Sequence, residues 1–270
     1  MKRQEKIKWF YQDMHNGLGN MIMATPMLRV LYKIHKKPIN IHFYDKSIRS
    51  LFVGAPFLNI LKNRPRCKWS WSSEPMYGRG SEQSDIEYNI EVHCGKKFLS
   101  SIEPAYVDLN NTMTLKRKKN KKYIAIFNGC LNKQKRKQRR KEIPIDCRDY
   151  IVQRCLDLGF IPVILGSRSD YKNFWRHNNI IGRKSVVNYL GKLSLKKTVS
   201  ILNQCDNFIS NDTGLYHVAG ALKKNGLVLW RGTDFYKNAT TFKGIKRVEN
   251  RKHVKKIYNK MVNKHLEELL

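Results

Sequence analysis

The chain has 270 residues, enough to bury one large hydrophobic core or two smaller ones. A hydrophobic fraction of 41%, with 13 Tyr, 11 Phe and 5 Trp, excludes a disordered basic tail. Lys and Arg number 53 against 21 Asp and Glu, and the net charge of +32 favours a polyanionic partner such as nucleic acid, an anionic membrane surface or a phosphorylated substrate. A lysine-rich composition with a well-solvated surface would explain the same charge without a partner.

Strands and helices are predicted to alternate along the chain. The expected strands are short apolar runs that end at turn residues, and they cover residues 6–12, 39–45, 88–94, 122–129, 160–167, 206–210 and 226–232. The expected helices have apolar residues at helical spacing, and they cover residues 21–35, 47–56, 145–159, 194–205 and 215–224. Residues 62–85 have the composition of a loop. Strands that alternate with helices predict parallel sheets.

A basic stretch interrupts this alternation and suggests a linker between two domains. We predict a first domain over residues 1–115, a basic linker over 116–122, a second domain over 123–250 and a C-terminal helix over 251–270. Both domains are expected to be doubly wound and to face a cleft, with ligands at the carboxyl ends of the strands.

The cysteines and the termini favour the cytoplasm. No two cysteines form a C-x-x-C pair; they are Cys67, Cys94, Cys130, Cys147, Cys155 and Cys205. This scatter predicts reduced thiols and provides no framework for a metal. The N-terminus lacks the apolar core of a signal peptide, and no stretch approaches the length of a membrane span.

Two glycine turns follow expected strands. In NDTGLYHVAG (211–220) a strand, a polar turn and a helix start succeed one another, and the N–H groups at a helix N-terminus can bind a phosphate. Asp212 or Thr213 could equally serve only as the helix cap. The other turn contains Gly17 and Gly19 and lacks the third glycine of a dinucleotide fingerprint. A phosphate loop of the form G-x-x-x-x-G-K-[ST] and a D-x-D pair for a divalent metal are both missing from the sequence.

Together these segments resemble glycosyltransferase family 9, the heptosyltransferase-like enzymes. GLGNMIMATPMLRVL is similar to the family's G-x-G-D turn and the A-T-P-A-L-R-like helix after it. Residues 190–234 resemble the family's stretch from a G-x-x-S-L helix through a D-[ST]-G-x-x-H turn to the strand before G-P-T. RKEIPID (140–146) is similar to its lysine-then-W-P stretch, with Lys141 at the lysine and Ile143 in place of Trp. The resemblance is weakest between residues 45 and 120.

This resemblance implies a GT-B architecture of two Rossmann-like domains, with the nucleotide sugar held by the C-terminal one and the acceptor by the N-terminal one. Asp212 would accept hydrogen bonds from hydroxyls of the donor sugar. Thr213 and Gly214 would hold the diphosphate with backbone N–H groups, and His217 would reach the same phosphates. Lys141 would neutralise phosphate charge that grows as the glycosidic bond breaks. Such fixed groups can replace a metal ion, so we expect neither a metal nor a cofactor, the nucleotide sugar being a substrate.

One residue departs from the family pattern. The family's G-x-G-D turn ends in an aspartate that is thought to act as the general base, and Asn20 occupies that position here. Because an amide cannot take a proton, the role must move or the chemistry must change. Asp13 is our first substitute and His15 the second, and Glu91 and His93 are further candidates, although His93 alone is better explained as a core residue. Alternatively, Asn20 only orients the acceptor, or transfer is impaired.

The choice of acceptor depends on charge. Two runs are almost entirely basic, residues 116–122 and 133–141. Either run could be a solvated loop, but the second follows a strand of the C-terminal domain and should border the cleft. We expect its cations to bind nucleic acid: Lys133, Lys135, Arg136, Lys137, Arg139 and Arg140. In the N-terminal loop Trp69, Trp71 and Tyr77 could stack on a base or a sugar, or belong to the core.

We therefore predict a metal-independent glycosyltransferase, a hexosyl-, pentosyl- or heptosyltransferase. The favoured acceptor is a hydroxymethylated base in DNA of the kind made by bacteriophages, flipped out of the duplex to reach the cleft. Such an enzyme would work in the cytoplasm, or in the host cytoplasm if a phage encodes it. One alternative is a lipopolysaccharide or surface-glycan transferase drawn to anionic headgroups. Another is a nucleic-acid-binding protein on a degenerate transferase scaffold. The resemblance implies inversion, with ADP as the default nucleotide and UDP left open.

Overall fold

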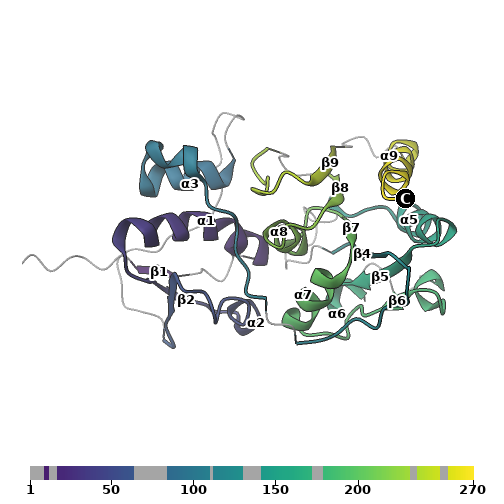
Figure 1. Cartoon of the computed structure of the whole chain (residues 1–270), viewed down its shortest axis with the longest axis horizontal. Coiled ribbons are helices and arrows are strands. Elements are labelled where there is room, and N and C mark those ends of the chain that lie inside the picture. The colour runs from purple at the N-terminus through teal and green to yellow at the C-terminus, as the bar shows by residue number, and fades with distance from the viewer. Residues whose placement is uncertain are drawn as a thin grey trace, which may run out of the picture.

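The structure is a computed structural model, and it describes residues 9–11, 17–63, 84–109, 112–129, 141–171, 179–231, 236–249 and 255–270. Its described strands form two sheets, and within each sheet all neighbouring strands are parallel. The parallel sheets confirm the expected α/β class. Figure 1 shows the sheets side by side along the long axis of the molecule.

The first sheet has three described strands in the order β1-β2-β3, and a long helix covers it. The strands are β1 (Trp9–Tyr11), β2 (Ile39–His42) and β3 (Leu58–Ile60). Helix α1 (Leu18–His35) leads from β1 to β2 and buries its apolar side chains, among them Ile22, Met27 and Leu28. The helix that we expect over 47–56 is only α2 (Lys46–Arg49). Gly54 and Pro56 follow it, and both residue types disfavour continuation of a helix.

The strand expected over residues 88–94 is wrong, because this segment belongs to helix α3 (Asp85–Cys94). A capping box starts the helix: Glu87 N donates to Ser84 Oγ at 3.2 Å, and Ser84 N donates to Glu87 Oε2 at 2.9 Å. Ile86 and Ile90 lie on one face of α3 and are buried. Alternating polar and apolar letters suggested a strand, but the cap and the four-residue spacing of these isoleucines determine the helix. A short 3₁₀ helix, η1 (Lys96–Ser101), follows.

The second sheet has six described strands in the order β6-β5-β4-β7-β8-β9. The strands are β4 (Tyr123–Phe127), β5 (Ile161–Leu165), β6 (Val187–Asn188), β7 (Asn207–Ser210), β8 (Gly226–Trp230) and β9 (Ile245–Glu249). Counted from β4, this is the 3-2-1-4-5-6 order of the Rossmann fold. The order reverses between β4 and β7, and ligands of such sheets bind outside the carboxyl ends of strands at that point.

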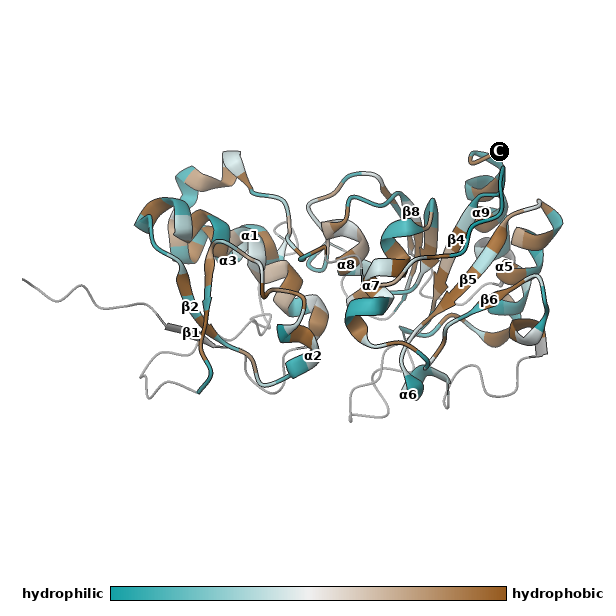
Figure 2. Ribbon diagram, turned by 60° about the horizontal axis from the view of Figure 1, so that its bottom comes forward, coloured by the Kyte–Doolittle hydropathy of each residue, from teal (hydrophilic) through white to brown (hydrophobic). Residues whose placement is uncertain are grey.

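Helices cover both faces of the second sheet. They are α5 (Ile145–Asp157), α6 (Arg168–Asp170), the 3₁₀ helix η4 (Asn179–Gly182), α7 (Leu195–Gln204), α8 (Gly214–Ala221) and α9 (Lys255–Glu267). Helices α7 and α8 contribute to one hydrophobic cluster of the sheet, and α5 and α9 contribute to the other. Figure 2 shows hydrophobic colour on β4 and β5 between these layers. Among the described helices, none is both long and apolar enough to cross a membrane.

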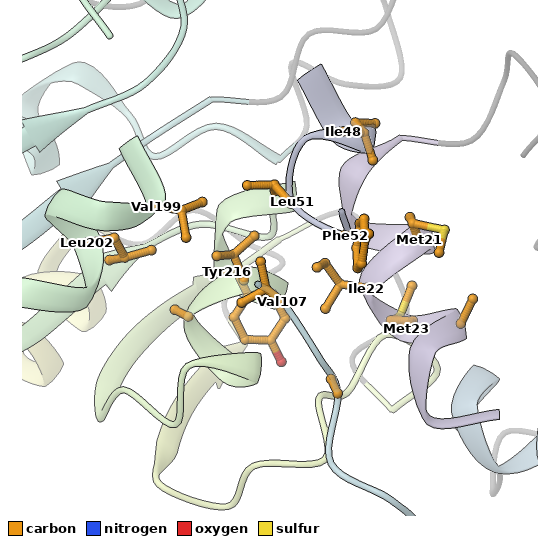
Figure 3. Packing of buried hydrophobic residues seen from close by; sticks show 14 of the residues in the cluster. Met21, Ile22, Met23, Ile48, Leu51, Phe52, Val107, Val199, Leu202 and Tyr216 are labelled. Carbon is orange, nitrogen blue, oxygen red and sulfur yellow. The ribbon is translucent and has the colours of Figure 1, made fainter. Parts of the chain in front are cut away.

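A single hydrophobic cluster joins the two sheets. It contains Ile22 of α1 and Leu51 from the first sheet's side, and Val199 of α7 and Tyr216 of α8 from the second. Val107, from the chain that connects the sheets, lies beside Tyr216 between the two groups (Figure 3). The first turns of α1 and α8 also touch each other. Since these side chains are almost fully buried, the sheets are held in one arrangement by the hydrophobic effect.

Hydrogen bonds fix the connecting chain on both sides of this core. Tyr106 N donates to Thr25 Oγ1 of α1 at 2.8 Å, and Leu115 N donates to Gln204 Oε1 of α7 at 2.8 Å. A second segment, residues 236–244, crosses back from β8, and its Lys237 O accepts from Asp85 N at 2.9 Å. Both crossings between the sheets are therefore bonded to the elements beneath them.

Helix α9 lies within the segment expected to form a C-terminal helix, and a buried histidine fixes it to the sheet. His265 Nε2 lies 2.8 Å from Asn207 Oδ1 at the start of β7. Tyr258, Val262 and Leu266 pack beside it in the second cluster. Burial lowers the pKa of His265 to about 4, and the cation of Lys246 acts in the same direction. The imidazole is therefore neutral in the folded protein at pH 7.

Acid should destabilise the protein through this histidine. The unfolded chain binds a proton at His265 below about pH 6.5, whereas the folded chain does so only near pH 4. The contribution of neutral His265 to the free energy of unfolding is therefore complete above about pH 6.5 and is lost as the pH falls toward 4. Between pH 7 and pH 5, the free energy of unfolding of the wild type should fall by about 2 kcal/mol more than that of His265→Gln. Urea titrations at both pH values measure this difference. The exposed His35→Gln is the control, and an equal pH dependence in His265→Gln would refute the assignment.

Candidate functional site

Residues of the second sheet that carry the family resemblance lie together at the point where its strand order reverses. Asn211 and Asp212 directly follow β7, and Asn128 directly follows β4, so both segments lie at the carboxyl edge of neighbouring strands. Segment 141–143 lies against them. Asn128 Oδ1 accepts from Ile143 N at 3.0 Å, and Asn211 Nδ2 donates to Lys141 O at 2.9 Å. These two asparagines, which the sequence analysis did not single out, fix the backbone that carries Lys141.

Lys141 and Asp212 form an ion pair at this edge. Lys141 Nζ lies 2.6 Å from Asp212 Oδ2, although the two residues are far apart in the sequence. The Asp212 side chain is 3% exposed and that of Lys141 is 21% exposed. A carboxylate shielded from water in this way keeps a fixed position because its charge is compensated by the ammonium. The structure thus brings together the two residues expected to contact sugar hydroxyls and phosphate.

His217 lies behind this pair and is neutral. Its Nε2 is 3.9 Å from Asp212 Oδ1, and its side chain is almost fully buried. The pKa of His217 is lowered to about 4, chiefly by burial; the Asp212 carboxylate opposes this shift and the Lys141 ammonium adds to it. The contact with Asp212 is therefore not an ion pair at neutral pH. Within the described part of the chain, Nδ1 of His217 has no hydrogen-bond partner.

Helix α8 starts at this site with its own side-chain cap. Thr213 is the N-cap, and its Oγ1 accepts from Leu215 N at 3.0 Å. The hydroxyl of Thr213 is thus used within the turn, as the capping interpretation expects. The contact of backbone N–H groups at Thr213 and Gly214 with a diphosphate stays a prediction.

The first turn of α1 packs against the first turn of α8. A Cβ at Gly214 would lie 2.9 Å from Leu18 Cβ, and a Cβ at Gly19 would lie 2.6 Å from His217 Cδ2. Both are closer than real Cβ contacts, so only glycine fits at these positions. The N-cap of α1, Gly17, has no side chain to cap the helix. Two helix N-termini, each carrying partial positive charge, therefore meet beside Lys141 and favour an anion between or beside them.

Asp170 is a further acidic residue at the same edge that the sequence analysis missed. It is buried, and its Oδ2 accepts from Ser167 N and from Ser167 Oγ, both at 2.7 Å. Desolvation raises its pKa. A Cβ at Gly129, after β4, would lie 2.3 Å from Asp170 Oδ1, so this carboxyl oxygen lies against the backbone at the carboxyl end of β4. The signal available in the sequence was the S-x-x-D capping box directly after an expected strand.

Other expected site residues do not join this cluster. Glu91 and His93 lie on helix α3, and not at the end of a strand. Cys94 Sγ is 3.9 Å from Met27 O, so this end of α3 packs on α1 at Met27. Met27 lies about two helical turns after Asn20, which is about 10 Å along the axis of α1. The base candidates Asp13 and His15 lie outside the described residues, as do the basic cluster Lys133, Lys135, Arg136, Lys137, Arg139 and Arg140 and the aromatics Trp69, Trp71 and Tyr77. Residues 116–122 precede β4 and so lie at the opposite edge of the sheet.

The described residues contain no group of three or more His, Cys, Asp or Glu side chains placed to hold a metal ion. The chemistry that this cluster can perform by itself is the fixation of an anion by Lys141 and two helix N-termini, next to a carboxylate that accepts hydrogen bonds from hydroxyls.

Comparison with known proteins agrees with this arrangement. The family model of glycosyltransferase family 9 (heptosyltransferase) matches residues 96–267. Among solved structures, the family 9 glycosyl transferase from Veillonella parvula DSM 2008 is 13% identical with a TM-score of 0.69, and the match covers 96% of this chain and 89% of that one. E. coli ADP-heptose lps heptosyltransferase II is 13% identical with a TM-score of 0.66, covering 96% of this chain and 100% of that one.

The name of a third similar structure includes an ADP-linked sugar. E. coli heptosyltransferase WaaC with ADP-2-deoxy-2-fluoro heptose is 13% identical with a TM-score of 0.60, covering 97% of this chain and 100% of that one. At such identities these matches show a shared GT-B fold. A search of functionally curated proteins found no significant match.

The contact between the two helix starts predicts that alanine destabilises the protein more at Gly19 than at Gly17. In Gly19→Ala the new methyl group would collide with the buried ring of His217, so we expect a loss of about 1–3 kcal/mol in the free energy of unfolding. Gly17→Ala is the matched control, because a Cβ there meets nothing within 4 Å. Denaturant titration of both variants measures the difference. Equal stability of the two variants would contradict the packing of α1 on α8.

Proposed function

This chain belongs to glycosyltransferase family 9, and from that membership we propose that it transfers a heptose or a similar sugar from an ADP-activated donor to a hydroxyl of lipopolysaccharide or another surface glycan. The family match covers the second sheet and its site residues. The names of two of the similar structures described above include an ADP-linked heptose, and one of these names also includes lps. This support favours the glycan acceptor over a DNA base.

The observation that carries the proposal is the ion pair between Lys141 and buried Asp212 beside the N-terminus of α8. A nucleotide sugar presents an anionic diphosphate next to a ring with hydroxyl groups, and the site offers a matching cation and carboxylate side by side. Helix α1 brings a second N-terminus to the same place. Each group is held by the fold before the donor arrives, which is what electrostatic stabilisation of a leaving group requires.

In the proposed reaction the acceptor hydroxyl oxygen bonds to the anomeric carbon of the donor sugar. The bond from that carbon to the diphosphate breaks, and the nucleoside diphosphate leaves with its electron pair. Lys141 and the N–H groups at the two helix starts stabilise the negative charge on the leaving oxygen. Asp212 holds the sugar through its hydroxyls, and no metal is needed in this scheme.

The hydroxyl proton must pass to a base, and Asn20 cannot take it. Asn20 is the third residue of α1, in the turn that packs on α8, so it is suited to orient an acceptor by hydrogen bonding. We propose Asp13 as the base, with His15 as the alternative, because both precede the same turn.

A DNA acceptor remains the outcome that would overturn the glycan proposal. The net charge of +32 motivates it, but neither the family match nor the similar structures support it. Charge alone does not distinguish a phosphorylated glycan from a nucleic acid.

Acceptor and donor can be tested together. With ADP-heptose and heptose-deficient lipopolysaccharide, mass spectrometry should detect a glycan heavier by one sugar, while hydroxymethylated duplex DNA should be unchanged. Asp212→Asn should reduce turnover by about 100-fold, because the carboxylate that holds the sugar hydroxyls and fixes the Lys141 ammonium is lost. Asp157→Asn, an exposed residue at the end of α5, should retain full turnover. Glycosylated nucleosides in place of glycan product would refute the acceptor, and full turnover in Asp212→Asn would refute the site.

The base is tested separately from the donor site. Asp13→Asn should abolish transfer but leave donor binding by calorimetry intact, because deprotonating the acceptor and holding the donor are separate tasks. Undiminished turnover would move the search to His15. Asn20→Asp restores the acid of the family pattern, and a large gain in rate would mean that the natural enzyme works without a base at this position.

A further inference from the structure

Cations gather at the edge of the second sheet opposite the site. The six described strands of this sheet are parallel, so their amino ends share one edge. This edge is formed by residues 116–122, 223–225 and 243–246 and the end of α9. Contacts join these segments: Gly226 N donates to Gly244 O at 3.4 Å, and Lys122 Nζ bonds Leu269 O. We call this surface the amino-edge face. Its basic residues are Lys116, Arg117, Lys118, Lys119, Lys121, Lys122, Lys223, Lys224, Lys243, Lys246 and Lys264.

Few acidic groups compensate this charge. Arg117 pairs with Asp206 at 2.6 Å, and Lys246 pairs with Glu268. In the described part of the chain, Lys118, Lys119 and Lys121 form no ion pair, and all three are exposed. Unpaired cations at this density repel one another, and an anion that binds among them removes that repulsion.

The loop before β4 borders an open depression among these cations. Residues 117–122 line it, and its volume is about 620 Å³. Two hydrogen bonds fix the loop to β4 and α7. Lys118 N donates to Tyr123 Oη at 2.7 Å, and Arg117 Nη1 donates to Gln204 O at 2.6 Å. The cations are therefore presented on a fixed scaffold, which lowers the entropic cost when a partner binds.

We propose that the amino-edge face binds the phosphate backbone of nucleic acid without reading its bases. A concave, cation-lined surface accepts separate phosphate groups along a strand. A bilayer is a less suitable partner, because binding at a membrane interface relies on exposed aromatic and apolar groups. Among the described residues of this face, Leu270 is the only large hydrophobic residue that is exposed. A membrane at this face would also hold the carboxyl edge, with Lys141 and Asp212, away from any acceptor in that membrane.

The nucleic acid bound at this face localises the enzyme and is not the sugar acceptor, because the second sheet lies between this face and the site at the carboxyl edge. The inference is therefore independent of the acceptor proposed above. Failure of glycan transfer would leave it intact, and failure of nucleic-acid binding would leave the transferase proposal intact.

Binding of the full-length protein to short DNA duplexes of two unrelated sequences, followed across salt concentrations, tests the proposal. For the wild type, log affinity should fall steeply with log salt. In Lys118→Gln/Lys119→Gln/Lys121→Gln the slope should become shallower by about 0.9 for each phosphate that the variant no longer binds, with equal weakening of both duplexes. The control Lys36→Gln/Lys96→Gln/Lys97→Gln removes the same charge from exposed positions near the first sheet and should retain the wild-type slope.

Three outcomes would overturn the proposal. Equal slopes in both triple variants would mean that the charge of the whole molecule, and not this face, attracts DNA. Absence of DNA binding at physiological salt, with tight binding to vesicles of phosphatidylglycerol and phosphatidylcholine, would assign the face to a membrane. A strong preference for one duplex sequence would show that bases are read. Thermal unfolding of both variants establishes that they are folded.

Discussion

The packing of α1 on α8 is the contact on which the rest of the molecule depends. Glycine at positions 19 and 214 lets the two helix starts come closer than any other residue type would permit. This approach allows Ile22 and Leu51 to share a core with Val199 and Tyr216, and so fixes one sheet against the other. It also places a second helix N-terminus next to Lys141. The same few contacts thus determine both the arrangement of the sheets and the electrostatics of the site.

Charged residues at the two edges of the second sheet differ in their exposure and in their pairing. At the carboxyl edge, charged groups are shielded from water and compensated, as in the pair of Lys141 with Asp212, and His217 beside them is kept neutral. At the amino edge most of the cations are exposed, and several have no acidic partner among the described residues. A buried pair holds its own charges in one geometry, whereas an exposed cluster of like charge attracts anions over a longer range. The carboxyl edge of the sheet is therefore suited to position a ligand, and the amino edge is suited to attract an anionic partner.

Much of this architecture could be predicted from the sequence, because apolar runs and turn residues report local structure directly. Strands β4, β5, β7 and β8 and helices α5, α7 and α8 appear where the patterns place them. The misses have physical causes. Segment 88–94 alternates like a strand, but the Ser84 and Glu87 cap makes it a helix. Strand β6 has only two residues, too few for any pattern.

The candidate site was less accessible to sequence analysis than the fold. Lys141 and Asp212 were found through a family resemblance, since no spacing rule links residues so far apart. Asn128 and Asn211, which hold the segment carrying Lys141, look like ordinary turn residues in the sequence and acquire their role only when β4 and β7 lie side by side. Asp170 was missed because its burial and its facing glycine are properties of the folded chain.

The shared core has a consequence for how this enzyme can change over time. A boundary between domains is usually a place where the chain can be cut or exchanged, because few contacts cross it. Here Tyr216, Val107 and Ile22 lie against one another across the boundary, and separating the halves would expose all three to water. The two halves are therefore not interchangeable modules. We expect a change in what the first half binds to arise by substitution within that half, and not by exchange with the first half of a relative.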